Sequence, residues 1–474
     1  MNLTESKKTL ALSGVVLGIV AAALAFFGNP KNMAICIACF IRDTAGAMKL
    51  HQAAVVQYVR PEIVGIVVGA FLISLITKEY RSTAGSSPMI RFVLGMIMMI
   101  GALVFLGCPL RMLIRMSAGD LNAYVALVGF VGGVFTGTAA LKKGFSLGRS
   151  YESRSVSGYV LPVLLVIVLI LSVTTTLMAV SEKGPGSMHA PVLIALVGGL
   201  VFGAVSQKCR TCFAGSFRDV ILMKNFDLIT IIGAFFVVML IFNIATGGFK
   251  LSFDGQPVAH AQHLWNILGM YVVGFAAVLA GGCPLRQLVL AGQGSSDSAV
   301  TFLGMFIGAA LCHNFGLAGA AAAAATDASP AVAGGPGMAG KAAVILCIAV
   351  LFVIGFLPGI QREKNRRTEI RDQRSEIKDQ RSEIKGQRLE IGDQKVQRTD
   401  QEETHMYEVD ARGLSCPEPL MLVSDALKSH PGEKLKVLVS EPHSRTNVEK
   451  FVKSRGLTVL VKETGSDFEL TIEG

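Results

Sequence analysis

Ten apolar segments, each close to the length of a membrane-spanning helix, constrain this chain more than any other feature of its sequence. They lie near residues 10–28, 61–77, 90–107, 121–141, 158–180, 190–207, 227–245, 264–282, 299–324 and 339–358. About 20 apolar residues cross the hydrocarbon core of a bilayer as an α-helix. We therefore expect an all-α polytopic membrane protein. Because the first segment is long and is followed by further spans, a cleaved signal peptide is not expected.

The distribution of lysine and arginine predicts how these spans are oriented. Basic residues gather near the N-terminus, in the loops 78–91, 142–157 and 208–226, and in the tail from 361, which we expect to be cytoplasmic. The protein would then lie in the inner (plasma) membrane with both termini inside. The segments 29–60 and 108–120 would face outward, yet they carry several arginines. Either the span count is off there, or those charges serve a site.

Two short motifs occur twice, in the same order and at nearly the same spacing. CPLR stands at 108–111 and 283–286, and CIACFIRD at 36–43 is echoed by CRTCFAGSFRD at 209–219. Cys36 precedes Cys209 by 173 positions, and Cys108 precedes Cys283 by 175. These offsets predict two homologous membrane halves, 1–180 and 181–360, each with five spans. Since five is odd, the second half enters the membrane upside down, as in many transporters whose substrate sites lie between such halves.

The repeated motifs combine groups that are unusual inside a membrane. Gly-Cys-Pro should interrupt a helix at Gly107 and Gly282, and such re-entrant backbone is tolerated only inside protein or beside a cavity. A buried arginine is costly and by default marks a functional site. A thiol, a helix start and an arginine together suit a small soft anion. The predicted substrate path is lined by Cys36, Cys39, Cys108, Arg111, Cys209, Cys212, Cys283 and Arg286.

Simpler interpretations compete with this one. Cysteine packs well as a small apolar residue, which is the interpretation we favour for Cys312 and Cys347. The two cysteine pairs could bind zinc, but the topology places them on opposite faces, and we expect no metal and no cofactor. His313 and Asn314 lie in an apolar segment, where a hydrogen-bonded helix contact is favoured over a ligand role.

The composition changes abruptly after residue 360. Residues 1–360 hold 23 Lys and Arg against 12 Asp and Glu, so the positive charge belongs to the membrane part and nucleic-acid binding is not expected. Residues 361–404 repeat isoleucine and glutamine every seven positions, which predicts a solvated helical linker or a weak coiled coil. Residues 405–474 predict a small α/β two-layer sandwich with the order βαβαββ. Its single cysteine, Cys416, stands at a helix start, where a thiolate is favoured, and suits a sulfur carrier that holds a persulfide.

The C-terminal stretch DARGLSCPEPLMLVSDAL, at 410–427, resembles the Cys-Pro-x-Pro signature of TusA-like (SirA/YedF-type) sulfur-carrier domains. The resemblance implies that Cys416 bears the sulfur. The membrane part resembles the YeeE/YedE family of thiosulfate and putative selenium transporters, and this implies a path lined by the motif cysteines. The thiosulfate-type branch carries Gly-Cys-Thr-Ser-Gly-His where this chain has Cys-Pro-Leu-Arg. The chain is therefore similar to the YedE branch, which is linked to selenium metabolism.

We therefore expect a transporter and not an enzyme. A small sulfur or selenium anion would enter through the bilayer along the cysteine-lined path and pass to the C-terminal domain, with a soluble cytoplasmic protein as the final sulfur acceptor. No phosphate-binding loop of the GxxxxGK[ST] type occurs, so the energy would come from gradients or downstream trapping. The alternative is a membrane thiol-disulfide oxidoreductase that relays reducing equivalents through CxxC pairs.

Overall fold

The computed structural model describes residues 7–30, 32–323, 332–357, 406–414, 417–465 and 467–473. The chain divides into two compact units, one formed by Met1–Ala139 with Leu147–Leu351 and the other by Ala140–Ser146 with Phe352–Gly474. The linker predicted at 361–404 and Cys416, the predicted sulfur-carrier residue, both lie outside the described residues.

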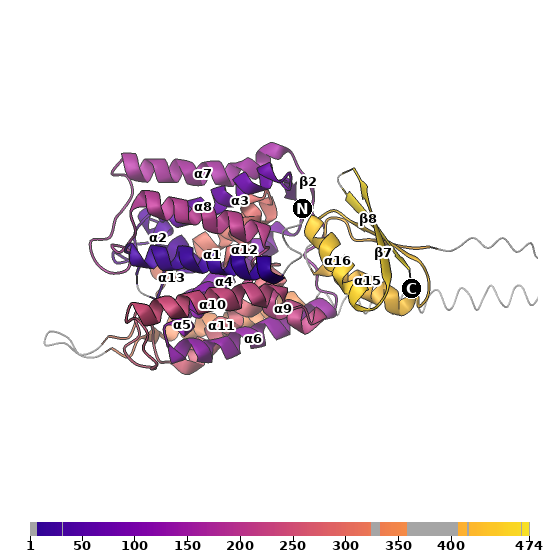
Figure 1. The fold of residues 1–474 in the computed structure, drawn as a ribbon. Helices are drawn as coiled ribbons and strands as arrows, with labels where there is room; N and C mark the ends of the chain where they lie inside the picture. The colour runs from indigo at the N-terminus through magenta and orange to yellow at the C-terminus, as the bar shows by residue number, and fades with distance from the viewer. Residues whose placement is uncertain are drawn as a thin grey trace, which may run out of the picture. The chain divides into compact units, whose positions relative to one another are not determined.

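The membrane part is helical and contains the expected spans (Figure 1). Within the described residues, nine helices are long and apolar enough to cross a bilayer, and a tenth apolar helix, α3, has 16 residues. All ten predicted segments fall on these helices, which confirms a multi-pass membrane protein. The helices are α1 (Lys7–Phe26), α2 (Ile37–Ala47), α3 (Pro61–Ile76), α4 (Pro88–Phe105), α5 (Pro109–Ser117), α6 (Leu121–Lys142), α7 (Ser155–Thr174), α8 (Val192–Lys208), α9 (Phe213–Met223), α10 (Asp227–Ala245), α11 (His263–Leu279), α12 (Pro284–Gly292), α13 (Ser296–Asn314) and a last helix, Met338–Leu357.

The helix lengths repeat between the two halves of the membrane part. Each half has two short helices, the second and the fifth, which are α2 and α5 in the first half and α9 and α12 in the second. The packing repeats as well. By helix order α8 corresponds to α1 and α10 corresponds to α3, and α1 packs against α10 just as α8 packs against α3. Figure 1 shows α2 and α5 toward one end of the helical bundle and α9 and α12 toward the other. This arrangement is that of an inverted repeat.

Hydrogen bonds between loops define the two ends of the membrane part. At one end, the backbone N–H of Lys250 donates to the carbonyl of Ala118, and that of Ala179 donates to Ala47. At the other end, the backbone N–H of Arg81 donates to Gln293. The loops 78–91, 142–157 and 208–226 contact one another at the second end. The predicted grouping of these three loops on one face is therefore confirmed, and the cytoplasmic location of that face is a prediction.

The arginines in the supposed outer loops have a physical explanation. Arg42 and Arg60 are buried against Asp43, and Arg115 is buried against Asp120 at 2.6 Å. Because these three arginines are buried in ion pairs, they do not act as free basic loop residues. They are therefore exceptions to the charge rule that require no change in the span count.

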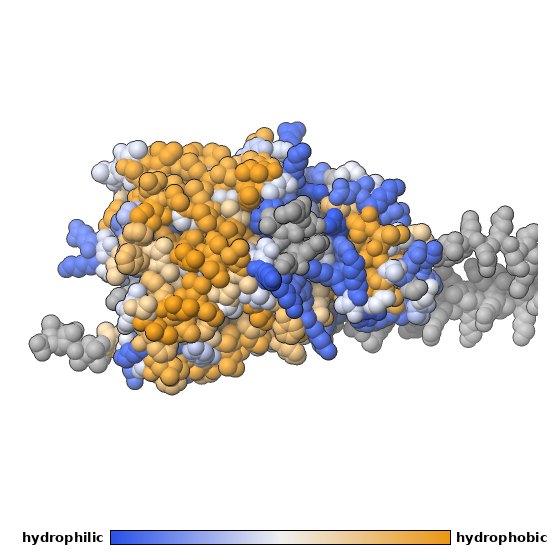
Figure 2. Space-filling model, viewed as in Figure 1, coloured by the Kyte–Doolittle hydropathy of each residue, from blue (hydrophilic) through white to orange (hydrophobic). Residues whose placement is uncertain are grey.

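The long helices shield the short ones from the bilayer. On α7 and α10 large apolar side chains stay exposed, among them Ile167 and Ile241, whereas every residue of α2 is buried. Figure 2 shows apolar side chains over most of the visible face of the membrane part. The short helices, with their cysteines and charges, thus occupy the interior, where polar groups can find partners.

The C-terminal unit contains the expected βαβαββ fold. Its elements are β5 (Tyr407–Asp410), α15 (Glu418–Ser429), β6 (Leu435–Val439), α16 (Pro442–Ser454), β7 (Thr458–Thr464) and β8 (Asp467–Glu473). The sheet order is β5-β6-β8-β7, with β5 parallel to β6 and the other pairs antiparallel. Alternate residues of β6 and β8 are buried, and this is the pattern of a sheet covered by helices on one face.

Candidate functional site: two cysteine gates

Cys36, Cys39 and Cys108 meet where two short helices begin. We call this cluster the first gate, after the role that the sequence predicts for it. Cys36 caps α2, and its Sγ accepts a hydrogen bond from the backbone N–H of Cys39 at 3.4 Å. Cys108 caps α5, and its Sγ lies 3.9 Å from the Sγ of Cys36. The Sγ of Cys108 therefore sits between the N-terminal ends of two helices, where negative charge is favoured.

The break before Cys108 differs in one detail from the expected break. The helix was predicted to end at the glycine, but α4 ends at Phe105 and the left-handed residue is Leu106, with φ of 65°. In the second half, Gly281 has a φ of 82° at the equivalent position. Because Pro109 fits the first helical turn, α5 begins immediately after the thiol.

The glycine of the motif makes room for the arginine. A Cβ atom placed on Gly107 would lie 2.7 Å from Cδ of Arg111, and one on Gly282 would lie 2.8 Å from Cγ of Arg286. Both arginine side chains therefore fold back over the break that precedes their own helix. The five residues Gly-Cys-Pro-Leu-Arg form one structural unit at both places where they occur.

Arg111 connects three separate segments around the first gate. Its guanidinium donates to the backbone carbonyls of Asn32 at 2.9 Å, Val258 at 3.0 Å and Leu106, and its Nη1 donates to Cys39 Sγ at 3.4 Å. The side chain is fully buried. The sequence indicated the buried charge, but it could not show that the donors are directed at backbone carbonyls from distant loops.

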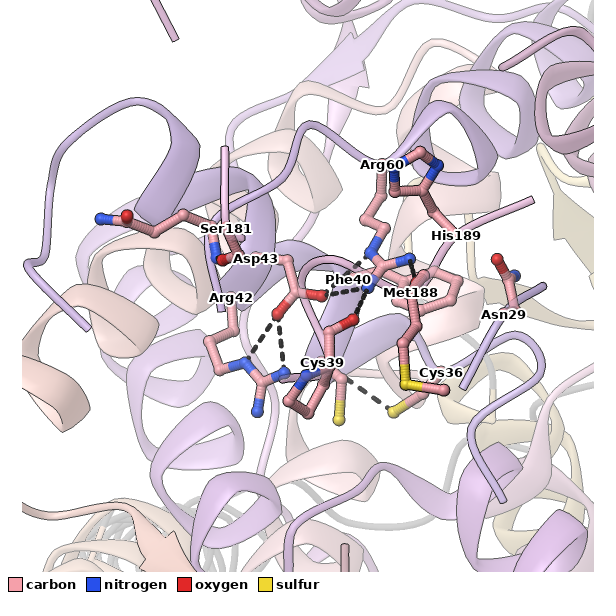
Figure 3. Close-up of polar contacts among 12 residues, drawn as sticks. Asn29, Cys36, Cys39, Phe40, Arg42, Asp43, Arg60, Ser181, Met188 and His189 are labelled. Atoms are coloured by element: carbon pink, nitrogen blue, oxygen red, sulfur yellow. Dashed lines mark hydrogen bonds and ion pairs between the residues drawn. The ribbon is translucent and has the colours of Figure 1, made fainter. Parts of the chain in front are cut away.

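An ion cluster beside the first gate was not predicted as part of the site. One carboxylate oxygen of Asp43 accepts hydrogen bonds from Nε and Nη2 of Arg42, at 2.9 and 2.6 Å. The other oxygen accepts hydrogen bonds from Nε and Nη2 of Arg60, at 2.9 and 2.7 Å (Figure 3). Arg60 also donates to the carbonyls of Pro185 and Met188. Figure 3 shows that the third guanidinium nitrogen of Arg42, Nη1, points away from Asp43. The Arg-Asp pair that is repeated in FIRD and SFRD is the sequence feature from which this cluster could have been predicted.

The second gate consists of Cys212 and Cys283. Cys212 caps α9 and accepts a hydrogen bond from the backbone N–H of Gly215 at 3.2 Å. Cys283 is the N-cap residue of α12, and its thiol lies close to that of Cys212. The second gate therefore repeats the arrangement of the first, with neighbouring thiols at two helix starts.

The structure corrects the alignment of the repeat. Because Cys36 and Cys212 both cap their helices, Cys36 corresponds to Cys212 and not to Cys209. Arg42 and Asp43 then precede Arg218 and Asp219 by the same 176 positions. The second Arg-Asp pair is also bonded, at 2.9 Å. The extra cysteine upstream of Cys212 had displaced the alignment by three positions.

Cys209 stands apart from the second gate. It caps the C-terminus of α8, and its Sγ lies 2.8 Å from the hydroxyl oxygen of Ser13 on α1. Cys39 has no cysteine counterpart, since Gly215 occupies the equivalent position. The first gate therefore brings three of the predicted path cysteines together and the second gate brings two.

Several buried polar side chains near the second gate have no hydrogen-bond partner among the described residues. They include both amide atoms of Gln207, and the side-chain oxygens of Gln287, Ser206 and Thr211. Thr211 adjoins Cys212 in the chain, and Gln287 lies one helical turn after Cys283. Buried polar groups are normally satisfied. Their arrangement here fits a place that water or a polar solute occupies.

The two gates are joined directly through the short helices. α2 contacts α12, and α5 contacts α9, so that each gate helix of one half touches a gate helix of the other. The gates therefore line the interface between the halves.

Positive charge at the first gate comes from arginine and not from histidine. Burial lowers the pKa of His260 to about 4, although its Nε2 lies 2.9 Å from the carbonyl oxygen of Val104. Burial also lowers the pKa of His51, which lies 3.1 Å from the carbonyl oxygen of Arg42. Both rings are therefore neutral near pH 7.

The other candidate residues are in packing contacts. The ring of His313 lies against that of His51, with centroids 4.6 Å apart, and Asn314 donates to the carbonyl of Leu50. Cys312 and Cys347 are buried. Within the part of the chain that the structure describes, no three His, Cys, Asp or Glu side chains form a group that could hold a metal ion. The zinc alternative therefore gains no support.

In the C-terminal unit, α15 begins at Glu418 with Pro417 as its N-cap, one residue later than the sequence suggested.

Comparison with known proteins agrees with the fold of both units. Residues 208–388 match the family described as Sulphur transport, and residues 407–474 match Sulfurtransferase TusA. The chain carries a sulphur transport domain and a TusA domain.

Individual relatives match shorter stretches. The chain is 31% identical over 111 residues to the thiosulfate transporter TsuA of Escherichia coli, and 31% over 113 residues to TsuA of Spirochaeta thermophila. Each alignment covers 23% of this chain, and 30% and 33% of those transporters, so the chain matches about a third of their length. It is also 41% identical over 44 residues to the sulfur carrier protein TusA of Pseudomonas aeruginosa, which is 9% of this chain and 56% of that protein.

Proposed function

We propose that the protein imports a small sulfur or selenium anion, such as thiosulfate or a related selenium species, through the interface between its two membrane halves. The observation that carries the proposal is the pair of equivalent gates. Each places two neighbouring thiols at the N-termini of two short buried helices, and the gate helices of the two halves contact each other. Thiols are weak donors to a soft anion and release it readily.

The residues around the gates supply the charge that such an anion needs. Arg42 keeps one guanidinium nitrogen directed away from Asp43, and we assign it the first contact with the anion beside Cys39. Arg111 and Arg286 contribute fixed positive charge and hold the breaks that present the thiols. The unpartnered polar side chains near the second gate would receive the anion together with water.

The names of the relatives support this proposal and extend it to the TusA domain. In the proposed orientation, in an inner membrane with the N-terminus and the TusA domain in the cytoplasm, the second gate opens inward. Cys416 then takes up the delivered sulfur and passes it to a soluble acceptor protein. Tethering keeps the carrier at an effective concentration of roughly millimolar near the exit.

The direct test is uptake of labelled thiosulfate and selenite by proteoliposomes that contain the purified protein. We expect Cys108→Ser and Cys283→Ser each to reduce uptake roughly tenfold or more, because each removes the sulfur that two helix starts share. The matched control is Cys347→Ser, a buried cysteine outside both gates, which should transport at the wild-type rate. Wild-type uptake by both gate variants would contradict the cysteine path.

A second prediction separates transport from delivery. Cys416→Ser should leave uptake by proteoliposomes unchanged, because the substitution lies outside the membrane part. In cells, it should reduce growth on a limiting sulfur or selenium anion by severalfold, and as strongly as deletion of 405–474. Wild-type growth of both strains would show that the TusA domain does not receive the imported sulfur.

One observation favours a second candidate, a thiol-disulfide oxidoreductase. Each gate holds two free thiols in contact, and such pairs could exchange with disulfides. This function requires a disulfide state during turnover. Alkylation followed by mass spectrometry would detect oxidised Cys36–Cys108 or Cys212–Cys283 in the working protein. Uptake by protein kept fully reduced would instead support transport.

A further inference from the structure

A buried carboxyl group near the first gate has no role in the path described so far. Glu62 lies in the first turn of α3 and is fully buried. Its Oε1 accepts a hydrogen bond from Asn29 Nδ2 at 2.8 Å, whereas its Oε2 has no hydrogen-bond partner among the described residues. A carboxyl group in this position loses its hydrogen bonds to water, and the protein replaces only some of them.

Among the described residues, no cation forms an ion pair with this carboxyl group. The charged and titratable groups that act on Glu62 are Arg60, Asp43 and Tyr58. Arg60 already donates to both the Asp43 carboxylate and two backbone carbonyls. The facing helix, α8, presents Gly199, where an added Cβ would lie 2.5 Å from the carbonyl oxygen of Glu62. A buried carboxyl group without an ion partner is stable only when it carries a proton.

Asn29 connects Glu62 to the first gate and to the second half of the molecule. The same Nδ2 that binds Glu62 donates to the carbonyl of Ala34 at 2.7 Å, two residues before the gate cysteine Cys36. The side-chain oxygen of Asn29 accepts from the backbone N–H of Ala190 at 2.9 Å, at the start of the second half. A change in the charge of Glu62 would therefore reach both the gate loop and the interface between halves.

We propose that Glu62 is the proton-binding site that couples anion import to the proton gradient, an inference that rests on the proposed transport function. In each cycle, Oε2 takes a proton from the outer solution and becomes a neutral carboxylic acid. After the interface rearranges, the same O–H bond breaks and the proton leaves to the inner solution with the anion. Nothing is oxidised or reduced. The proton also offsets part of the negative charge that moves against a membrane potential negative inside.

A purely structural role makes a different prediction for one substitution. Glutamine has the shape of glutamate, keeps an oxygen for Asn29, and cannot release a proton. If Glu62 served only packing and hydrogen bonding, Glu62→Gln would behave as the wild-type protein. If it carries the coupling proton, Glu62→Gln would lose the response to a pH gradient.

The experiment compares two rates in the same proteoliposomes, with labelled thiosulfate as the probe. One is uptake driven by an acidic exterior, with a pH-sensitive dye enclosed, and the other is exchange at equal pH. For the wild-type protein, we expect the gradient to raise uptake at least fivefold over exchange and to acidify the interior. For Glu62→Gln the ratio should fall to about one, whereas Glu182→Gln, an exposed glutamate at the same end, should keep the wild-type ratio.

A second measurement covers the case in which Glu62→Gln gives too little exchange for a ratio. In weakly buffered detergent, at a pH high enough to remove the proton from Glu62, the purified protein should take up protons when thiosulfate is added, and Glu62→Gln should take up none. Proton uptake by Glu62→Gln, a retained pH-gradient response in that variant, or wild-type transport without proton movement would each overturn the inference. These outcomes leave the transport function intact. An absence of exchange by the wild-type protein would instead overturn the proposed function, and the inference with it.

Discussion

Asp43→Asn is expected to lower the free energy of unfolding by about 3–5 kcal/mol, the cost of breaking a buried ion pair by removing one partner. The carboxylate holds two arginines through four hydrogen bonds, and all three side chains are almost completely buried. An amide has one acceptor oxygen and no charge, so two guanidinium groups would remain buried without a counter-charge. Unfolding of the purified protein in a denaturing-detergent titration would measure the change.

Two further variants make the result specific. Asp254→Asn removes an exposed carboxylate in a loop at the same end and should change the stability by less than about 0.5 kcal/mol. Arg42→Gln should cost less than Asp43→Asn, because Arg60 would still neutralise Asp43. It should nevertheless reduce anion uptake strongly, since Arg42 is the proposed first contact. A loss of under 1 kcal/mol for Asp43→Asn would contradict the ion cluster as a stabilising element.

Features that depend on local pattern could be predicted from the sequence. The spans followed from apolar length, and the C-terminal sandwich followed from its strand and helix periodicity. The re-entrant breaks followed from Gly-Cys-Pro, because proline restricts its own backbone and that of the preceding residue. The exact turn residue did not follow, since Leu106 adopts a left-handed conformation that no sequence rule favours for leucine.

Features that depend on contacts between distant segments were missed or misassigned. The repeated Cys-x-x-Cys pattern suggested that Cys36 and Cys209 correspond, but helix capping decides the equivalence, and Cys212 is the cap. The two carbonyl partners of Arg60 come from a loop 125 and 128 positions away, and Glu62 meets Asn29 across the gate loop. The arrangement of such polar groups depends on tertiary packing, which a single sequence does not reveal.

Arg111→Lys is expected to reduce uptake at least tenfold and to destabilise the protein, although it preserves the positive charge. The guanidinium of Arg111 donates in several directions at once, to three backbone carbonyls and to Cys39. An ammonium group is a compact point charge and cannot reproduce this planar fork. Each carbonyl left without a donor in the interior costs roughly 1–3 kcal/mol. Uptake assays and detergent unfolding of the same preparation would measure both effects.

Arg111→Lys distinguishes two roles of Arg111 that Arg111→Leu would remove together. If Arg111 acted only as a fixed positive charge for the anion, Arg111→Lys would transport as the wild-type protein does. If it holds the gate loop, the break before Cys108 and the loop around Val258 together, transport must fall even though the charge remains. Arg154→Lys, at an exposed position before α7, should change neither property and serves as the control. A severe loss with lysine would show that the gate thiols act only when their helix starts are held in place.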